Sequence, residues 1–264
     1  MEEVGDTVRV ELAVDLTCQK CVSSVTRALE SNNNVKNIHV NLEKQLVIVD
    51  TSYGVDNVVK LVESTGKRAV VMGQGRVTSG TFSDTSSNLG NAVAMLHEGN
   101  PTSGIRGVTR FSQVSMNSCI IDGTVDGLLP NATHKIGIHE YGDLSNGCDS
   151  CGDVFSGPPG SETKQQTAYG DMDLIESNED GRSSFRITSN TIKVWEIIGR
   201  SMVLQTKQPE TSLWSRLACG IIARSAGLFE NSKRICACDG IPLWDERDVP
   251  TAGKARQEYK KPDI

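Results

Sequence analysis

Hydrophobic and polar residues follow two different periods along residues 7–72. In the segment VRVELAVDL, residues 8–16, apolar side chains fall at every second position, which is typical of a β-strand. Between residues 20 and 30 the apolar residues recur at helical spacing, and the polar run SNNN then favours the end of that helix. A second helical stripe covers residues 55–62 and is closed by Gly66.

Three further apolar runs have the composition of short strands, at residues 38–42, 45–51 and 68–72. Together with the first strand and the two helices they give the order β-α-β-β-α-β. This order is that of a ferredoxin-like unit. We therefore predict an α+β domain of this type over residues 1–75.

The chain changes character after this domain. Residues 76–90 are rich in Gly, Ser and Thr and predict a linker that runs into an edge strand. Residues 91–229 show no convincing helical period, and short β-type runs alternate there with turn-rich segments, which predicts an all-β Greek-key barrel or sandwich. Residues 230–264 are polar with Gly and Pro and predict an irregular C-terminal tail.

Charge and segment length exclude several classes of function. The formal net charge is −6, and no cluster of Lys and Arg is present, so nucleic acid is not expected as the main partner. The N-terminal residues MEEVGDT are acidic and lack the apolar segment of a secretory signal, and no apolar run is long enough to span a membrane. We expect a cytoplasmic protein, with the mitochondrial intermembrane space as a second compartment.

The eight cysteines are the most informative residues for function. Three close pairs stand out, which are Cys18 with Cys21, Cys148 with Cys151, and Cys236 with Cys238. In a reducing compartment, close pairs indicate metal binding or thiol exchange before structural bridging. The isolated Cys119 lies in a strand-like run and is expected in the core.

Cys18 and Cys21 lie where the first strand turns into the first helix. The start of a helix favours thiolates, and two thiolates at this spacing suit a soft ion of low coordination number, for which Cu(I) is the best candidate. A redox C-x-x-C of the thioredoxin type is the alternative. The motif LTCQKC in this element order resembles the heavy-metal-associated domains of copper chaperones and copper ATPases, with Leu16 where those domains usually carry Met.

Three segments of the β region, HKIGIHEYGD, NGCDSCGD and RLACGIIA, resemble copper/zinc superoxide dismutases. The resemblance implies an eight-stranded Greek-key barrel and a disulfide between Cys148 and Cys219. It leaves Cys151 with three possible roles, as a metal ligand, as a resolving thiol or as a spectator.

The histidines that a dismutase needs are largely missing. By the resemblance, His139 is the one copper-ligand position that keeps its histidine, and Asp171 is kept on the zinc side. The other ligand positions hold residues without an imidazole, namely Gly137, Val154, Ala168 and Gln205. Since these side chains cannot replace imidazole on copper or zinc, we expect neither superoxide dismutation nor zinc in the barrel. An active dismutase with a fused metal-uptake domain is the disfavoured alternative.

The residues that match the dimer interface of the dismutases are nevertheless present. They are Gly142, Asp143, Leu144, Ile198, Gly199, Arg200, Ile221, Ile222 and Ala223. An inactive barrel with this surface suggests a module that docks on a dismutase subunit by mimicking its partner, in a two-fold type of contact.

The three parts in this order, with KVWEIIGRS, RLACGIIARSAGLF and ICACDG, resemble the family of copper chaperones for superoxide dismutase over nearly the whole chain. The resemblance implies that Cys18 and Cys21 acquire Cu(I) and that the barrel forms a heterodimer with copper/zinc superoxide dismutase, or a homodimer in its absence. It also implies that Cys236 and Cys238 pass copper to the client and promote its intrasubunit disulfide. A thiol oxidoreductase or copper buffer without a dedicated client is a third hypothesis.

Overall fold

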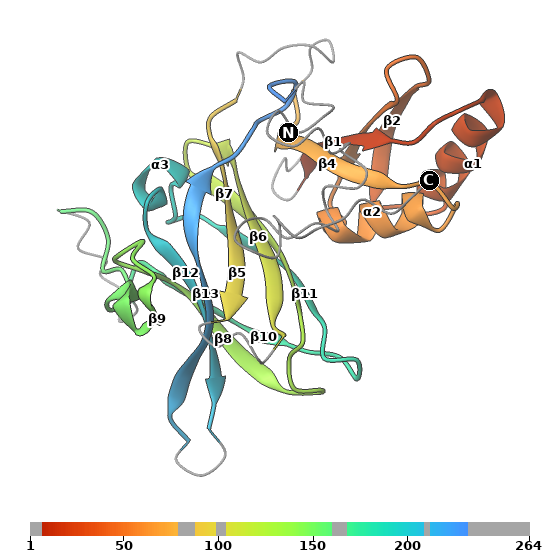
Figure 1. Ribbon diagram of the computed structural model, residues 1–264. Helices are drawn as coiled ribbons and strands as arrows, with labels where there is room; N and C mark the ends of the chain where they lie inside the picture. The colour runs from red at the N-terminus through yellow and green to blue at the C-terminus, as the bar shows by residue number, and fades with distance from the viewer. Residues whose placement is uncertain (1–6, 79–87, 99–103, 160–167, 209–211, 232–264) are drawn as a thin grey trace.

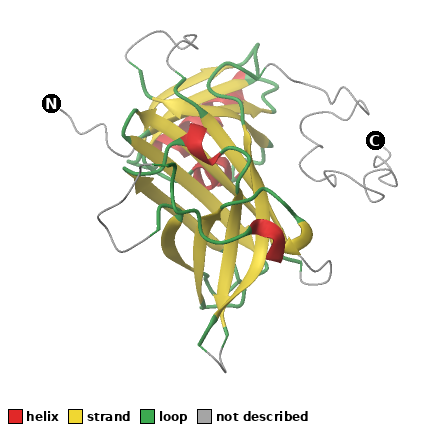
Figure 2. Cartoon of the chain, turned by 90° about the vertical axis from the view of Figure 1, so that its left-hand side faces the viewer, coloured by secondary structure: helices red, strands yellow, loops and turns green. Residues whose placement is uncertain are grey.

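The computed structural model describes residues 7–78, 88–98, 104–159, 168–208 and 212–231. These residues form an N-terminal α+β domain that lies beside a larger β-barrel (Figure 1). Figure 2 shows that strands make up most of the chain and that helices are few. No helix among the described residues is long and apolar enough to cross a membrane.

The N-terminal domain is a four-stranded antiparallel sheet with two helices packed on it. Its elements are β1 (Val8–Val14), α1 (Gln19–Glu30), β2 (Val35–Asn41), β3 (Leu46–Thr51), α2 (Val55–Glu63) and β4 (Ala69–Arg76). The strand order β2-β3-β1-β4 places β1 in the centre, where all its residues are buried. Val10 of β1, Val25 of α1 and Val58 of α2 are fully buried in one core. The ferredoxin-like domain predicted from the period of the apolar residues is thus confirmed.

The second domain is an eight-stranded antiparallel barrel. Its sheet has the order β10-β8-β12-β13-β5-β6-β7-β11, and the two outermost strands leave the barrel nearly closed. The bounds are β5 (Asn91–Glu98), β6 (Arg106–Ser115), β7 (Ser118–Asp126), β8 (Thr133–His139), β10 (Asp171–Glu176), β11 (Ser183–Ser189), β12 (Ser201–Lys207) and β13 (Trp214–Arg224). Phe111, Ile136 and Met202 fill the interior together with Cys119. The predicted all-β barrel is confirmed, and the predicted core position of Cys119 agrees with its complete burial.

Sequence patterns missed or misassigned four elements. Strand β10 has acidic residues at alternate positions and only Ile175 is buried there, so it lacks a strong apolar signal. The short β9 (Ser145–Cys148) and the 3-10 turn η1 (Asp149–Cys151) lie in a segment that we expected to be a loop. The run KVWEIIGRSMVLQ is not one strand but a helical turn, α3 (Val194–Ile197), followed by β12.

The residues between the two domains test the predicted linker and edge strand only in part. Within 76–90, only Arg76 belongs to a strand among the residues that the structure describes, as the last residue of β4. Residues 79–87 lie outside the described part of the chain. The expected edge strand is therefore not seen at 77–78 or 88–90, where the sequence has no alternation of apolar residues to stabilise one.

The two domains share a hydrophobic contact. Val114 of β6 and Ile120 of β7 are almost completely buried, and both belong to the core of the N-terminal domain rather than to the barrel interior. On the same side of the barrel, Leu228 packs 3.3 Å from the position that a Cβ of Gly75 would occupy. The N-terminal domain therefore covers β6 and β7, whereas β9 lies on the opposite side of the barrel (Figure 1).

Two arginines of the barrel strengthen this contact. Arg186 of β11 forms a two-pronged ion pair with Asp122 of β7, at 2.9 and 2.8 Å, and also donates to the Thr51 carbonyl of the N-terminal domain at 3.1 Å. Arg182 joins Asp126 of β7 at 2.9 Å to Asp56 of α2 at 2.9 Å. Paired, forked contacts of this kind hold a fixed geometry, so the two domains are docked in one orientation.

Replacing Arg186 should destabilise the protein strongly. Asp122 is only 4% exposed, and R186Q would remove the forked partner of its buried carboxylate and leave Arg110, which lies opposite Asp122 on β6, as the remaining charge beside it. Breaking a buried pair in this way costs about 3 kcal/mol, which urea unfolding of the variant should measure. R224Q, at an exposed arginine of β13, is the matched control and should change the free energy of unfolding little. A similar small change in R186Q would contradict the assigned role.

Candidate metal centre

The thiols of Cys18 and Cys21 face each other at the start of α1. Cys18 is the N-cap residue and is exposed, while Cys21 lies in the first helical turn and is 8% exposed. Their Sγ atoms are 3.2 Å apart. No group of three or more His, Cys, Asp or Glu side chains that could hold a metal occurs among the described residues, so the pair offers two sulfur ligands and open access.

Thr17 prepares one of these thiols for metal binding. Its hydroxyl lies 3.3 Å from Cys21 Sγ. Hydrogen bonds from the Thr17 side chain and backbone, and then from Cys18, lower the pKa of Cys21 to about 6, against a smaller opposing effect of burial. Cys21 is therefore mainly a thiolate at neutral pH, the form that binds metal. Sequence reasoning missed Thr17, although its position next to Cys18 was a signal that could have been used.

The loop that carries the two cysteines is attached to the sheet by backbone contacts. Leu16 is 2% exposed and anchors the loop in the core, as expected for an apolar residue in this place. Gln45 donates its side-chain amide to the Leu16 carbonyl at 3.2 Å, and the Asp15 N–H donates to the Arg68 carbonyl at 3.1 Å. The thiols thus project from a fixed loop at one end of the N-terminal sheet.

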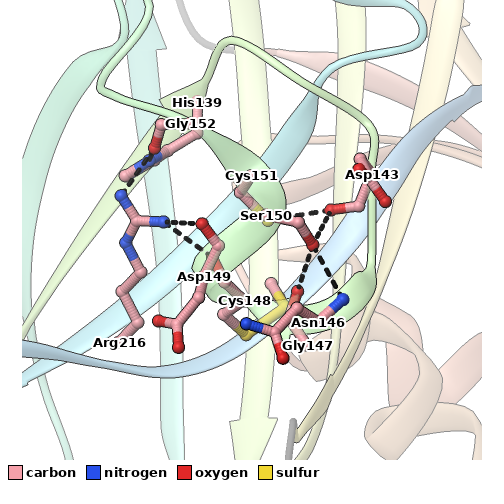
Figure 3. Close-up of a disulfide and its surroundings, with 11 residues drawn as sticks. His139, Asp143, Asn146, Gly147, Cys148, Asp149, Ser150, Cys151, Gly152 and Arg216 are labelled. Atoms are coloured by element: carbon pink, nitrogen blue, oxygen red, sulfur yellow. Dashed lines mark hydrogen bonds between the residues drawn. A yellow bond between two sulfur atoms is a disulfide. The ribbon is translucent and has the colours of Figure 1, made fainter.

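A disulfide lies in the barrel, between Cys148 and Cys219, the pair that the resemblance to dismutases implies (Figure 3). It ties β9 to β13, and the Cα atoms are 5.6 Å apart. Arg216 donates to the carbonyls of Cys148 and Gly152, at 2.7 and 2.5 Å, and so holds the same loop. The free thiol of Cys151 is fully buried beside the disulfide, and it lies 3.7 Å from the Asp143 carbonyl.

The remaining dismutase-like positions are engaged in protein contacts. His139 donates from Nδ1 to the Gly152 carbonyl at 2.9 Å (Figure 3). Val154 pairs with the backbone of His139 as an isolated bridge, and Gly137 lies opposite Asp171 in the sheet. Burial is the main cause that lowers the pKa of His139, so its imidazole is neutral at pH 7.

The three segments expected to form the docking surface meet at one place. A Cβ on Gly142 would lie 2.3 Å from the Gly199 carbonyl and 3.3 Å from a methyl carbon of Ile221, so these glycines permit close backbone contact. The Gly199 N–H donates to the Ile222 carbonyl at 2.9 Å, and Arg200 accepts from the Ile222 N–H at 2.8 Å. Loop 142–144, α3 with the residues after it, and β13 therefore form one continuous patch.

The side chains of this patch are not all exposed. Leu144 and Ile221 are 36% and 43% exposed, and the neighbouring Trp195 of α3 is 44% exposed. Ile222, which we expected in the interface, is fully buried in the barrel core, because alternate residues of β13 face opposite sides of the sheet. Ile222 thus contributes its backbone to the patch, and Ile221 contributes the apolar side chain.

The other predicted thiols, Cys236 and Cys238, lie outside the described residues. The structure therefore brings together Cys18 with Cys21 and Cys148 with Cys219. The patch formed by loop 142–144, α3 with the residues after it, and β13, called the docking patch below, lies at a distance from Cys18 and Cys21.

Comparison with known proteins agrees with both domains. A model of the heavy-metal-associated domain matches residues 11–72, and a model of copper/zinc superoxide dismutase matches residues 105–222. The copper chaperone for superoxide dismutase of Homo sapiens is 41% identical over 273 residues, which cover 98% of this chain and 96% of that protein. The superoxide dismutase 1 copper chaperone of Saccharomyces cerevisiae is 28% identical over 255 residues, which cover 92% of this chain and 95% of that protein.

A plant relative shows the same organisation. The chloroplastic/cytosolic copper chaperone for superoxide dismutase of Arabidopsis thaliana is 33% identical over 235 residues, which cover 89% of this chain and 69% of that protein. These matches span both domains, the one that carries the thiol pair and the barrel that lacks most of the ligand histidines of a dismutase. The chain belongs to the family of copper chaperones for superoxide dismutase.

Proposed function

We propose that this protein carries copper as Cu(I) on Cys18 and Cys21 and delivers it to a copper/zinc superoxide dismutase. The observation that carries the proposal is the pair of facing thiols, one of them with a pKa of about 6, on a domain joined to a dismutase-like barrel that lacks most of the ligand histidines. Two thiolates suit the soft, low-coordinate Cu(I) ion. The names of the relatives support copper and superoxide dismutase as cargo and client.

The barrel recognises the client through the patch formed by Gly142, Asp143, Leu144, Ile198, Gly199, Arg200 and Ile221. Exposed Leu144 and Ile221 supply apolar contact, and the close backbone contact of Gly142 with Gly199 holds loop 142–144 against the residues after α3. Because the patch resembles a subunit interface of the client, the barrel forms a heterodimer with a dismutase subunit, and a homodimer when the client is absent.

The C-terminal tail carries copper from Cys18 and Cys21 to the client docked on the barrel. It also oxidises the client thiols. Helix α1, which begins after Cys18, and the docking side of the barrel at β9 lie on opposite sides of the molecule (Figure 1). Copper therefore has to travel, and Cys236 with Cys238 can take it by exchange of thiolate ligands. In its disulfide form, this C-x-C pair oxidises two client thiols to the intrasubunit disulfide and is itself reduced to two thiols by the same two electrons.

The barrel itself does not dismutate superoxide. Its ligand positions hold Gly137, Val154, Ala168 and Gln205. These side chains offer no imidazole, which supports a barrel that holds no zinc and does not dismutate superoxide. We place the protein in the cytoplasm and the mitochondrial intermembrane space, where its client would be newly made.

Removing the Thr17 hydroxyl should raise the pKa of Cys21. In T17V the hydrogen bond that contributes most to the lowered pKa of about 6 is lost, so the pKa should move toward the ordinary value of about 8.5. A pH titration of the cysteine Cβ signals by NMR measures this. S23A is the matched control. Ser23 is a nearby residue of α1, and its hydroxyl donates to the Gln19 carbonyl rather than to a cysteine. If Cys21 keeps its pKa in T17V, Thr17 does not activate the thiol.

A charge on the docking patch should weaken binding of the client. Gly199 has φ +80° and open space around its Cβ position, so G199E projects a carboxylate from the patch. We expect binding to a metal-free dismutase subunit, measured by calorimetry, to weaken at least about tenfold, or about 1.4 kcal/mol. G104E is the control, because Gly104 has φ +74° and equally open surroundings away from the patch. Equal loss of binding in both variants would refute the assignment.

Replacing both tail cysteines should abolish client maturation but leave copper binding at Cys18 and Cys21 intact. The variant C236S/C238S retains Cys18 and Cys21, so it should still bind copper, whereas the dismutase mixed with it should stay inactive and lack its disulfide. The measurements are copper content of the chaperone and activity of the client. D239N, next to the pair, is the control and keeps both thiols. Normal maturation with C236S/C238S would exclude the tail as donor.

A further inference from the structure

The segment between β8 and β10 includes several positions that bind metal in a dismutase by the resemblance. In this chain, Val154 and Ala168 offer no donor atom, and only Asp171 is kept on the zinc side. Among the described residues no three His, Cys, Asp or Glu side chains are grouped so as to hold a metal. A zinc ion needs three or four such ligands, so the residues present do not fit it.

Lys135 contacts the one acidic ligand that remains. Its Nζ lies 2.8 Å from Asp171 Oδ1, and both side chains are 28% exposed. Lys135 precedes Gly137 by two residues on β8, so both point to the same side of the sheet, and Gly137 lies directly opposite Asp171. The ammonium group therefore supplies a positive charge to the carboxylate that, in a dismutase, would bind the metal.

Tyr169 fastens the end of the same segment, next to Ala168. Its hydroxyl accepts the Lys193 N–H at 2.9 Å, and it contacts the Thr191 carbonyl at 2.8 Å and the Glu196 carboxylate. Its ring packs edge-on against Phe155, with centroids 5.3 Å apart. Burial is the main cause that raises the pKa of Tyr169, so the hydroxyl stays protonated and continues to donate.

Backbone contacts bring the two ends of the segment together on β8. The Phe155 N–H donates to Ile138 at 2.8 Å, the Gly170 N–H donates to Phe155 at 2.7 Å, and the Ile138 N–H donates to Gly170 at 2.8 Å. A Cβ on Gly170 would lie 2.2 Å from the Ile138 carbonyl, so this contact requires glycine. The guanidinium of Arg200, a residue of the docking patch, lies 3.4 Å from the centre of the Phe155 ring.

We propose that Lys135 and Tyr169 replace the metal in holding the described part of this segment, residues 140–159 and 168–170, so that the residues next to the docking patch keep their conformation without zinc. Lys135 is the built-in counter-charge of Asp171, and Tyr169 anchors the loop to the residues around α3. The inference rests on the part of the proposed function that leaves the barrel without zinc. It adds that the lost ligands are compensated by specific residues of this chain.

Hydrogen exchange of the full-length chain, followed by mass spectrometry, tests the proposal locally. Peptides that cover residues 138–159 are compared in EDTA and in zinc chloride, and their exchange in the wild type should be the same in both. K135Q and Y169F should each speed this exchange about two- to fivefold, as expected for one partly exposed ion pair or one hydrogen bond. K135R should restore wild-type exchange, and K207Q, at an exposed lysine of β12, should leave it unchanged.

Each other outcome contradicts the proposal. Slower exchange of the loop with zinc in the wild type would show that metal fastens it. Unchanged exchange in K135Q or in Y169F, or an equal effect of K207Q, would remove the assigned role of that residue. Client maturation is measured with the same wild-type sample. If zinc does not change the hydrogen exchange of the wild type and the client nevertheless stays inactive, copper delivery is rejected but the metal-free fastening is not.

Discussion

The covalent tie between Cys148 and Cys219 holds the part of the barrel on which the docking patch is built. The two residues are 71 positions apart in the sequence, and closing a loop of that length stabilises the fold by about 4–5 kcal/mol through the unfolded state. The tie fixes the segment that carries Leu144 against β13, which carries Ile221. Arg216 adds hydrogen bonds to carbonyls on both sides of Cys151. The crosslink therefore acts together with these hydrogen bonds to restrict the shape of the patch.

The two domains have different chemical roles. The N-terminal domain needs thiols that are accessible and ionised, and it provides them on a short loop beside Thr17. The barrel needs a rigid surface, and the region where a dismutase binds its metals has backbone bonds, an aromatic pair and the ion pair of Lys135 with Asp171. Arg182 and Arg186 then hold the domains in one orientation, which keeps the first thiol pair away from the patch.

Sequence patterns were sufficient where each element carries its own signal. The apolar stripes of α1 and α2 and the alternation in β1 predicted the N-terminal fold, because the regularly spaced apolar residues of each element lie together in one core. Strand β10 and helix α3 gave weaker signals. β10 is half exposed and acidic, and α3 is one turn that ends at the positive φ of Gly199. Such elements form because neighbouring strands position them.

The sequence by itself determined the chemistry that is available: which cysteines lie close together along the chain, which ligand histidines are absent and that an α+β domain precedes a β-barrel. These features depend on residue identity and short spacing. Only the tertiary structure decided that Thr17 acts on Cys21, that Ile221 rather than Ile222 faces outward, and that Lys135 meets Asp171. Each of these depends on the direction of a side chain or on a contact between separate strands. The turn from the loop into α1 sets the first, and the pleat and register of the folded sheet set the other two.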